Sequence, residues 1–123
     1  MGKLLIVDDE LDVREFARSF FRKRGFDVFI ASAGREAMDL VDKENPDLIL
    51  LDIRMGEMSG IDVLRELRQR NNPVKVVMVS GIEEDAVVEE TTLLGALGFI
   101  HKPLILEELE KIVLREFAVP QPI

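Results

Sequence analysis

The sequence predicts an α/β fold, a doubly wound (βα)5 sandwich in which five strands form one parallel sheet. Three observations predict it. Short apolar runs occur five times along the 123 residues, a stretch with helical periodicity follows each run, and charged or polar side chains come directly after most of the runs. Right-handed crossovers between successive parallel strands then place helices on both faces of the sheet.

The five apolar runs are continuous rather than alternating, which is typical of parallel strands that helices cover on both faces. They occupy residues 3–7, 27–31, 47–51, 74–79 and 99–101. All but the last are rich in valine, isoleucine and leucine. We therefore expect a single buried parallel sheet.

Five helical patterns follow these runs. They are centred on residues 11–21, 37–41, 61–67, 83–94 and 106–117. Gly25 is a natural stop for the first, and Asn45-Pro46 ends the second. The segment from Ser59 to Asp62 fits a capping box that opens the third. The fourth has modest helix propensity because it contains adjacent threonines and adjacent valines.

The length corresponds to one domain, which we expect over residues 1–117. Residues 118–123 contain two prolines and are expected to form a C-terminal tail or the start of a linker. No apolar run is long enough to span a membrane, and the N-terminus enters a strand pattern without a signal peptide. We therefore expect a cytoplasmic protein.

The composition excludes several functional classes. The formal net charge of −8 argues against direct binding to nucleic acid or to an anionic membrane. The absence of cysteine excludes disulfides, thiolate nucleophiles and sulfur-ligated metals. A cation, or a partner with a basic patch, fits this charge better.

Polar side chains follow four of the five predicted strands. Asp8, Asp9 and Glu10 follow the first, Asp52 the third, Ser80 the fourth and Lys102 the fifth. The carboxyl ends of parallel strands lie along one edge, where ligands of open α/β sheets bind. We therefore expect five of these side chains to converge on one site: Asp8, Asp9, Asp52, Ser80 and Lys102.

This set of side chains has a specific chemistry. Two carboxylates 4 Å apart repel by about 4 kcal/mol at an effective dielectric constant of about 20, so such a cluster shifts its pKa values or binds a hard cation. Oxygen ligands without histidine or cysteine favour Mg²⁺ or Mn²⁺. A carboxylate can also attack phosphorus, while a metal, a lysine and a hydroxyl neutralise the phosphoryl oxygens.

Five motifs spread over essentially the whole chain resemble those of response regulator receiver domains, the CheY-like family of two-component signal transduction. They are Ile6-Val7-Asp8-Asp9-Glu10, Leu50-Leu51-Asp52-Ile53-Arg54-Met55, Ser59-Gly60, Val79-Ser80-Gly81 and Gly95-Ala96-Leu97-Gly98-Phe99-Ile100-His101-Lys102-Pro103. The resemblance implies a flavodoxin-like strand order of 2-1-3-4-5. It also implies a phosphorylation-controlled switch that promotes only its own phosphorylation and dephosphorylation, not an enzyme that turns over external substrates.

The resemblance implies that Asp52 accepts a phosphoryl group from a sensor histidine kinase or a phosphotransfer protein. It implies Asp9 and Asp52 as direct Mg²⁺ ligands, Asp8 as a ligand through water, and the backbone carbonyl of Arg54 as the last protein ligand. Met55 is followed by Gly56-Glu57, where the family often has Pro-Gly, so this loop departs from the common pattern.

The remaining motif positions imply the switching machinery. Lys102 would contact the phosphoryl group, and Lys102-Pro103 matches the usual cis peptide of the family. Ser80 would close onto the phosphate and Phe99 would turn inward with it. The face made by the fourth helix, fifth strand and fifth helix would then change its affinity for a downstream target or output domain, or form a phosphorylation-dependent homodimer.

Simpler interpretations stay open beside these. Asp8, Asp9 and Glu10 could cap the first helix, where negative charge is favourable. Ser80 also fits a capping box with Glu83, and Phe99 could be an ordinary core residue. A pseudo-receiver, which has the same fold but binds partners without phosphorylation, is the main functional alternative.

Two other α/β classes fit the sequence poorly. A flavin-binding domain needs a loop rich in serine, threonine or glycine after its first strand, and Asp8-Asp9-Glu10 would repel the flavin phosphate. An aspartate-nucleophile phosphatase would carry its nucleophile after the first strand in an Asp-x-Asp-Gly-like run, which is absent.

Overall fold

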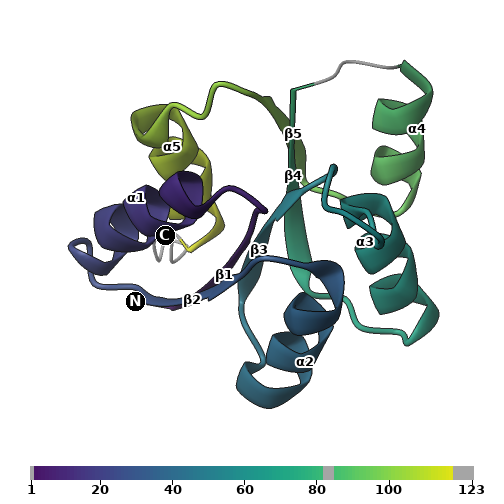
Figure 1. Cartoon of the computed structure of the whole chain (residues 1–123), viewed down its shortest axis with the longest axis horizontal. Helices are drawn as coiled ribbons and strands as arrows, with labels where there is room; N and C mark the ends of the chain where they lie inside the picture. The colour runs from purple at the N-terminus through teal and green to yellow at the C-terminus, as the bar shows by residue number, and fades with distance from the viewer. Residues whose placement is uncertain (1, 82–84, 118–123) are drawn as a thin grey trace, which may run out of the picture.

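The computed structural model describes residues 2–81 and 85–117, which form ten alternating strands and helices (Figure 1). In chain order these are β1 (Lys3–Val7), α1 (Leu11–Arg22), β2 (Asp27–Ala31), α2 (Gly34–Glu44), β3 (Leu48–Asp52), α3 (Gly60–Gln69), β4 (Lys75–Ser80), α4 (Asp85–Leu93), β5 (Gly98–His101) and α5 (Leu106–Glu116). The predicted alternation of strand and helix is therefore confirmed. The predicted tail, residues 118–123, lies outside the described residues.

The five strands form one parallel sheet in the order β2-β1-β3-β4-β5, as the family resemblance implies. β3 is the central strand. Its residue Leu51 pairs with Val7 of β1 and with Met78 of β4. This register aligns the carboxyl ends of the three inner strands, so the residues that end them share one edge.

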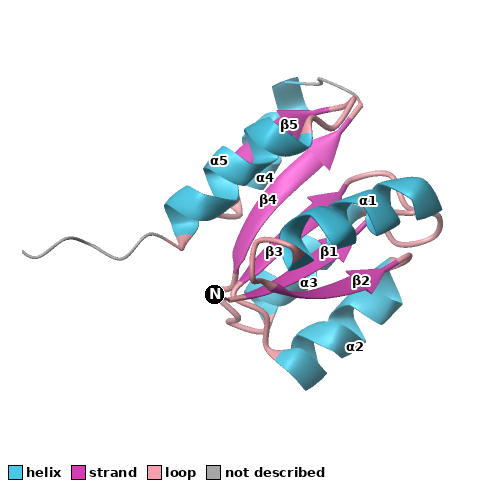
Figure 2. Ribbon diagram, turned by 90° about the vertical axis from the view of Figure 1, so that its left-hand side faces the viewer, coloured by secondary structure: helices cyan, strands magenta, loops and turns pink. Residues whose placement is uncertain are grey.

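Two helices cover one face of the sheet and three cover the other. Figures 1 and 2 show α1 and α5 on one side and α2, α3 and α4 on the opposite side. Along β1, Leu4 and Ile6 pack with α1 and α5, while Leu5 and Val7 pack with α2 and α3. Alternate strand residues thus enter two separate cores, which explains why the apolar runs are continuous.

Five strand boundaries differ from the prediction by one residue: both ends of β3, both ends of β4 and the start of β5. Asp52 and Ser80 are the last residues of β3 and β4 rather than the first loop residues, because Asp52 pairs with Val79 and Ser80 pairs with His101. β5 begins at Gly98, which also pairs with β4. Both polar side chains therefore project from ordered strand backbone rather than from loops.

The helix ends follow the local sequence signals. The Ser59 side chain accepts a hydrogen bond from the Asp62 amide, and Asp62 accepts one from the Ser59 amide, so the predicted capping box is confirmed. Asn45 ends α2 in the left-handed conformation. The capping box predicted at Ser80 depends on residues 82–84, which lie outside the described residues. Across the described helices, none has both the length and the apolar character that a membrane span requires.

Candidate functional site

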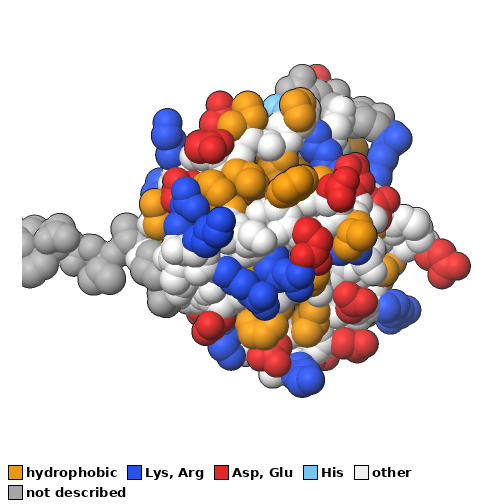
Figure 3. All heavy atoms as spheres, turned by 60° about the vertical axis from the view of Figure 1, so that its left-hand side comes forward, with side chains coloured by type: hydrophobic (Ala, Val, Ile, Leu, Met, Phe, Trp, Pro, Cys, Tyr) orange, Lys and Arg blue, Asp and Glu red, His pale blue; other side chains and the backbone are white. Residues whose placement is uncertain are grey.

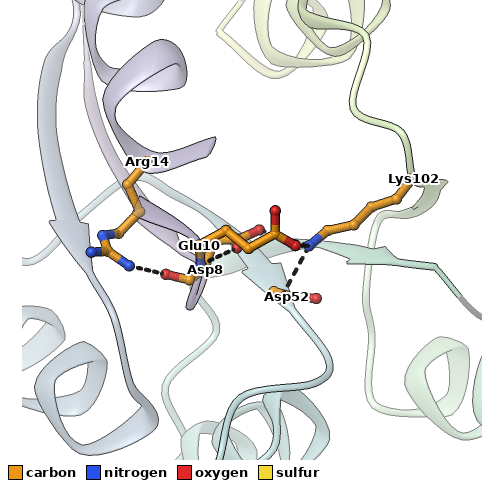
Figure 4. Close-up of polar contacts among 5 residues, drawn as sticks. All are labelled: Asp8, Glu10, Arg14, Asp52 and Lys102. Carbon is orange, nitrogen blue, oxygen red and sulfur yellow. Dashed lines mark hydrogen bonds and ion pairs between the residues drawn. The ribbon is translucent and has the colours of Figure 1, made fainter. Parts of the chain in front are cut away.

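The carboxyl ends of the inner strands bring three buried polar side chains to one edge of the sheet. Asp8 follows β1, Asp52 ends β3 and Ser80 ends β4, and each is at most 3% exposed. Lys102, directly after β5, extends its side chain across this edge (Figure 4). Four segments far apart in the sequence therefore build a single polar site above an apolar sheet.

The Lys102 ammonium group lies among three carboxylates. Its Nζ is 3.1 Å from Asp8 Oδ2, 3.3 Å from Asp52 Oδ2 and 3.5 Å from Glu10 Oε1 (Figure 4). The Asp8 and Asp52 side chains are nearly inaccessible to solvent, whereas Glu10 is exposed. One cation thus offsets the charge of two buried carboxylates, which would otherwise repel each other.

Backbone hydrogen bonds hold these residues to the strand ladders. The Asp8 amide donates to the Ala31 carbonyl at 3.1 Å, and the Lys102 amide donates to the Ser80 carbonyl at 2.8 Å. The Arg14 guanidinium from α1 also donates to the Asp8 carbonyl at 2.7 Å (Figure 4). The Lys102–Pro103 peptide bond is cis. The site is therefore built on fixed backbone rather than on free loops.

The backbone at Asp52 has a close neighbour at the start of α3. The Gly60 amide donates to the Ile53 carbonyl at 2.8 Å, and a Cβ atom at Gly60 would lie 2.1 Å from the Asp52 carbonyl oxygen. Only glycine permits this approach, because the atom in the way is backbone. Gly60 thereby sets the position of the Asp52 main chain.

We expect Gly60→Ala to lower the free energy of unfolding by about 1–3 kcal/mol, because the methyl group forces α3 and the end of β3 apart. Urea denaturation measures this change. Gly98→Ala is the matched control, since its added Cβ would meet only Val77 Cγ1, at 3.9 Å, an ordinary contact. Equal stability of the two variants would contradict the close approach.

The acidic residues after β1 offer oxygen atoms for a metal ion. One carboxylate oxygen from each of Asp8, Asp9 and Glu10 lies within 4.8 Å of the others. Asp8 is buried, whereas Asp9 and Glu10 are exposed, so one side of the group is buried in the protein and the other faces solvent. This all-oxygen set fits a hard cation such as Mg²⁺. Asp52 is not in this group, and Lys102 contacts Asp8 and Asp52 together.

The environment of Asp52 raises its pKa from 3.8 to about 6. The largest cause is burial, the second is the charge of Asp8, and the charge and hydrogen bond of Lys102 partly offset them. Burial lowers the pKa of Lys102, but its hydrogen bond to Asp8 and the charges of Asp52 and Asp8 outweigh this effect and raise it. Lys102 therefore stays charged.

The raised pKa predicts that the Asp52 carboxylate destabilises the fold at neutral pH. Between about pH 4 and pH 6 the native state binds more protons than the unfolded state, so stability falls as pH rises through this range. Without Mg²⁺, Asp52→Asn is expected to raise the free energy of unfolding by about 2 kcal/mol at pH 7. At pH 3 the gain should vanish. Urea denaturation at both pH values measures it, and a loss of stability at pH 7 would contradict the prediction.

The comparisons with known proteins agree with this geometry. The sequence profile of the family described as "Response regulator receiver domain" matches residues 4–114. The chain belongs to this family. Sporulation initiation phosphotransferase F of Bacillus subtilis is 35% identical over 111 residues, which are 90% of each protein. Regulatory protein AtoC of Escherichia coli is 37% identical, and the matched region is 94% of this chain but 25% of AtoC.

Solved structures of receivers have the same fold. The receiver domain of the Francisella response regulator 1452 superposes with a TM-score of 0.89 at 28% identity, and the match covers 95% of this chain and 97% of that one. Receivers are the phosphorylation-dependent switches of two-component systems, and the family acts as a signalling switch rather than as a turnover enzyme.

Three further positions predicted from the sequence lie near the edge of this receiver site. Arg54 is exposed two residues after Asp52, and the part of its carbonyl in metal binding stays a prediction. Phe99 is half-buried in β5 and packs against the core under α2 and α3, with its ring centroid 5.3 Å from that of His101. Both predicted roles of Phe99, switch and core, therefore stay open. Gly56 adopts a positive φ of 53°, which explains a glycine in this loop.

Three residues of the site were missed as site residues by the sequence analysis. Glu10 contacts Lys102, Arg14 binds the Asp8 carbonyl, and Gly60 packs on the Asp52 backbone. The Ser59-Gly60 pair was visible as a helix start, but its distance to Asp52 depends on tertiary packing. Arg14 gave no signal, because an arginine on an amphipathic helix is ordinarily a surface residue.

Proposed function

We propose that this receiver accepts a phosphoryl group on Asp52 from phosphohistidine of a sensor histidine kinase or a phosphotransfer protein. The observation that carries the proposal is the position of Lys102 Nζ, 3.3 Å from Asp52 and 3.1 Å from Asp8 at the carboxyl edge of the sheet. A carboxylate nucleophile, a fixed cation and oxygen ligands for a metal are the components that phosphoryl transfer to an aspartate requires.

In the proposed reaction an Asp52 carboxylate oxygen attacks the phosphorus atom, the P–N bond breaks, and the histidine imidazole leaves. Near neutral pH a carboxyl with a pKa of about 6 is largely ionised, as the nucleophile must be. Lys102 then exchanges its contact with Asp52 for the phosphoryl oxygens. The buried Ser80 hydroxyl at the end of β4 would donate a hydrogen bond to the same oxygens.

Asp8, Asp9 and Asp52, with the Arg54 carbonyl, would hold Mg²⁺ or Mn²⁺. When bound, the ion neutralises charge on the phosphoryl oxygens. The clustering of the Asp8 and Asp9 carboxylates supports this assignment. Glu10 belongs to the same cluster and would lie near the outer ligands of the ion.

A groove beside the site supports docking of the phosphodonor protein. It has a volume of about 520 Å³ and lies between α1 and the segment after β5. Its lining includes Val13, Phe16, Leu104 and Leu106, with Lys102 at the site. Phe16 is 68% exposed, and Figure 3 shows a band of hydrophobic side chains crossing this side of the molecule. An apolar partner helix could cover this band and bring its phosphohistidine to Asp52.

The proposed output follows from the phosphoryl group that Asp52 gains. A phosphoryl group carries about −1.5 to −2 charges at neutral pH and would draw Lys102 and Ser80 toward it. The resulting shift of α4 and β5 would change the α4-β5-α5 face for a target, an output domain or a second copy of the chain. Leu93, the last residue of α4, is 81% exposed.

Acetyl phosphate with Mg²⁺ tests the proposal, with intact mass as the readout. We expect one phosphoryl adduct that requires Mg²⁺ and disappears on incubation without acetyl phosphate. A receiver known to be labelled serves as the positive control. If the control is labelled and this chain is not, the pseudo-receiver alternative replaces the proposal.

A further inference from the structure

The helix that would carry the output, α4, has little apolar contact with the rest of the fold. Thr91 is its only buried residue among those described, and Val87 is a partly buried residue that packs on the core. Thr91 and Thr92 both donate their hydroxyls to the Val88 carbonyl, at 3.0 and 2.8 Å. Such side-chain bonds back to the helix do not stabilise it. Something other than burial must therefore hold α4 in place.

A single arginine of α3 contacts the C-terminal end of α4. Arg68 Nε donates to the Leu94 carbonyl at 2.7 Å, and Nη2 is 3.5 Å from the Gly95 carbonyl. Nη1 donates to the carbonyls of Asn72 and Val74, both at 2.9 Å, in the segment that leads into β4. One guanidinium thus joins the end of α4 to the start of β4. Its planar, rigid fork suits this task better than an ammonium group.

The turn after α4 is itself tightly closed. The Gly95 amide donates to the Thr92 carbonyl and the Ala96 amide to the Thr91 carbonyl, both at 2.9 Å, with Gly95 at a φ of 81°. This is the bonding pattern of a Schellman motif. The Leu97 amide then donates to the Val76 carbonyl of β4 at 2.8 Å. The last turn of α4 is therefore fixed on both sides.

The first half of α4 lies over a hollow instead. A cavity of about 460 Å³ separates Asp85, Val88 and Glu89 from His101 at the end of β5. The N-terminal end of α4 is also the end that is closer to Ser80 in the sequence. Arg65 forms an ion pair with Glu90, in the middle of α4, but both side chains are more than 40% exposed, so this pair contributes little.

We propose that Arg68 is the pivot of α4: it fixes the C-terminal end of the helix while the first half moves over the hollow toward or away from β5. The proposal rests on the proposed function for the signal that drives the motion, since Ser80 would respond to a phosphoryl group. The pivot itself is a property of the unphosphorylated chain and can be tested there.

Residue-resolved amide hydrogen exchange by NMR tests the pivot. In an unanchored helix the ends fray, so amides at the ends exchange faster than amides in the middle. If Arg68 anchors the C-terminal end of α4, this order is reversed. We then expect slower exchange at Leu94, Ala96 and Leu97 than at Val88 and Glu89. Arg68→Met removes the guanidinium donors and should speed amide exchange at Leu94, Ala96 and Leu97 by about tenfold or more. Arg70→Met is the matched control, because Arg70 pairs with Asp42 and Glu66 and not with α4.

The outcomes separate the pivot from the proposed function. Unchanged exchange at residues 94–97 in Arg68→Met overturns the pivot, as does wild-type exchange that is faster there than at residues 88–89. If Arg68→Met does not fold, Arg68→Lys is measured instead and should show the same direction of change, because the three donors of one ammonium nitrogen cannot reproduce the four contacts of the guanidinium fork. After phosphorylation, chemical-shift changes in α4 should be confined to its first half in the wild type and extend to residues 94–97 in the variant. Failure to form the adduct would overturn the proposed function and leave the exchange result to decide the pivot.

Discussion

Asp52→Asn is expected to abolish the Mg²⁺-dependent adduct that acetyl phosphate forms with the wild-type chain. The variant keeps the size of the side chain, and its amide oxygen can still accept a hydrogen bond from Lys102. It loses the negative oxygen that attacks phosphorus, and an amide oxygen is too weak a nucleophile to replace it. Intact mass after incubation with Mg²⁺ and acetyl phosphate measures the result.

Asp39→Asn is the control for this experiment. Asp39 is an exposed carboxylate on α2, so the substitution makes the same chemical change away from the sheet edge. It should be labelled like the wild type. Labelling of Asp52→Asn to the same extent as the control would place the acceptor elsewhere. Peptide mapping would then identify it, with Asp8 and Asp9 as the neighbouring carboxylates to inspect.

Lys102→Met should destabilise the fold at pH 7 without Mg²⁺ by about 3 kcal/mol, because it leaves buried carboxylates without their cation. The side chains of Asp8 and Asp52 are each 4% exposed, so water cannot replace the ammonium group effectively. The loss should shrink as pH falls toward about 6 and then level off, because without Lys102 the pKa of Asp52 lies above its wild-type value of about 6 and protonation relieves the unpaired charge. Urea denaturation across this pH range measures both effects.

Added Mg²⁺ should also restore part of the stability of Lys102→Met, because an ion that binds only the native state stabilises it by mass action. Lys111→Met, an exposed position on α5, is the control and should change stability little at any pH. A Lys102→Met protein as stable as this control at pH 7 would show that Asp8 and Asp52 do not depend on the lysine.

Most of the fold could be predicted because its signals are local. Continuous apolar runs such as Leu48 to Leu51 indicate strands with two buried faces, and Ser59 with Asp62 indicates a helix start. The one-residue shifts at Asp52 and Ser80 could not be predicted, because only pairing with the neighbouring strand decides whether a polar residue continues the ladder. Propensity alone would place both in loops.

The site was predictable where it follows from topology. Parallel strands bring their carboxyl ends to one edge, so Asp8, Asp52 and Lys102 come together as strand-end residues. The contacts of Glu10, Gly60 and Arg68 depend instead on how helices pack against that edge. An exposed carboxylate, a glycine at a helix start and an arginine on a helix give no local sign of such contacts.

The chain positions of the charges in this site affect the order in which the protein can fold. Asp8 and Asp52 belong to the first half of the chain, while Lys102 follows Asp52 by 50 residues. An intermediate that has paired β1 with β3 but has not added β5 brings two carboxylates together with no lysine between them. Repulsion therefore opposes early closure of this edge, and β5 supplies the missing charge as it docks. The charges of Asp8 and Asp52 are thus compensated at the step that completes the sheet. A nascent chain that ends before Lys102 carries two uncompensated carboxylates at the carboxyl edge of its sheet.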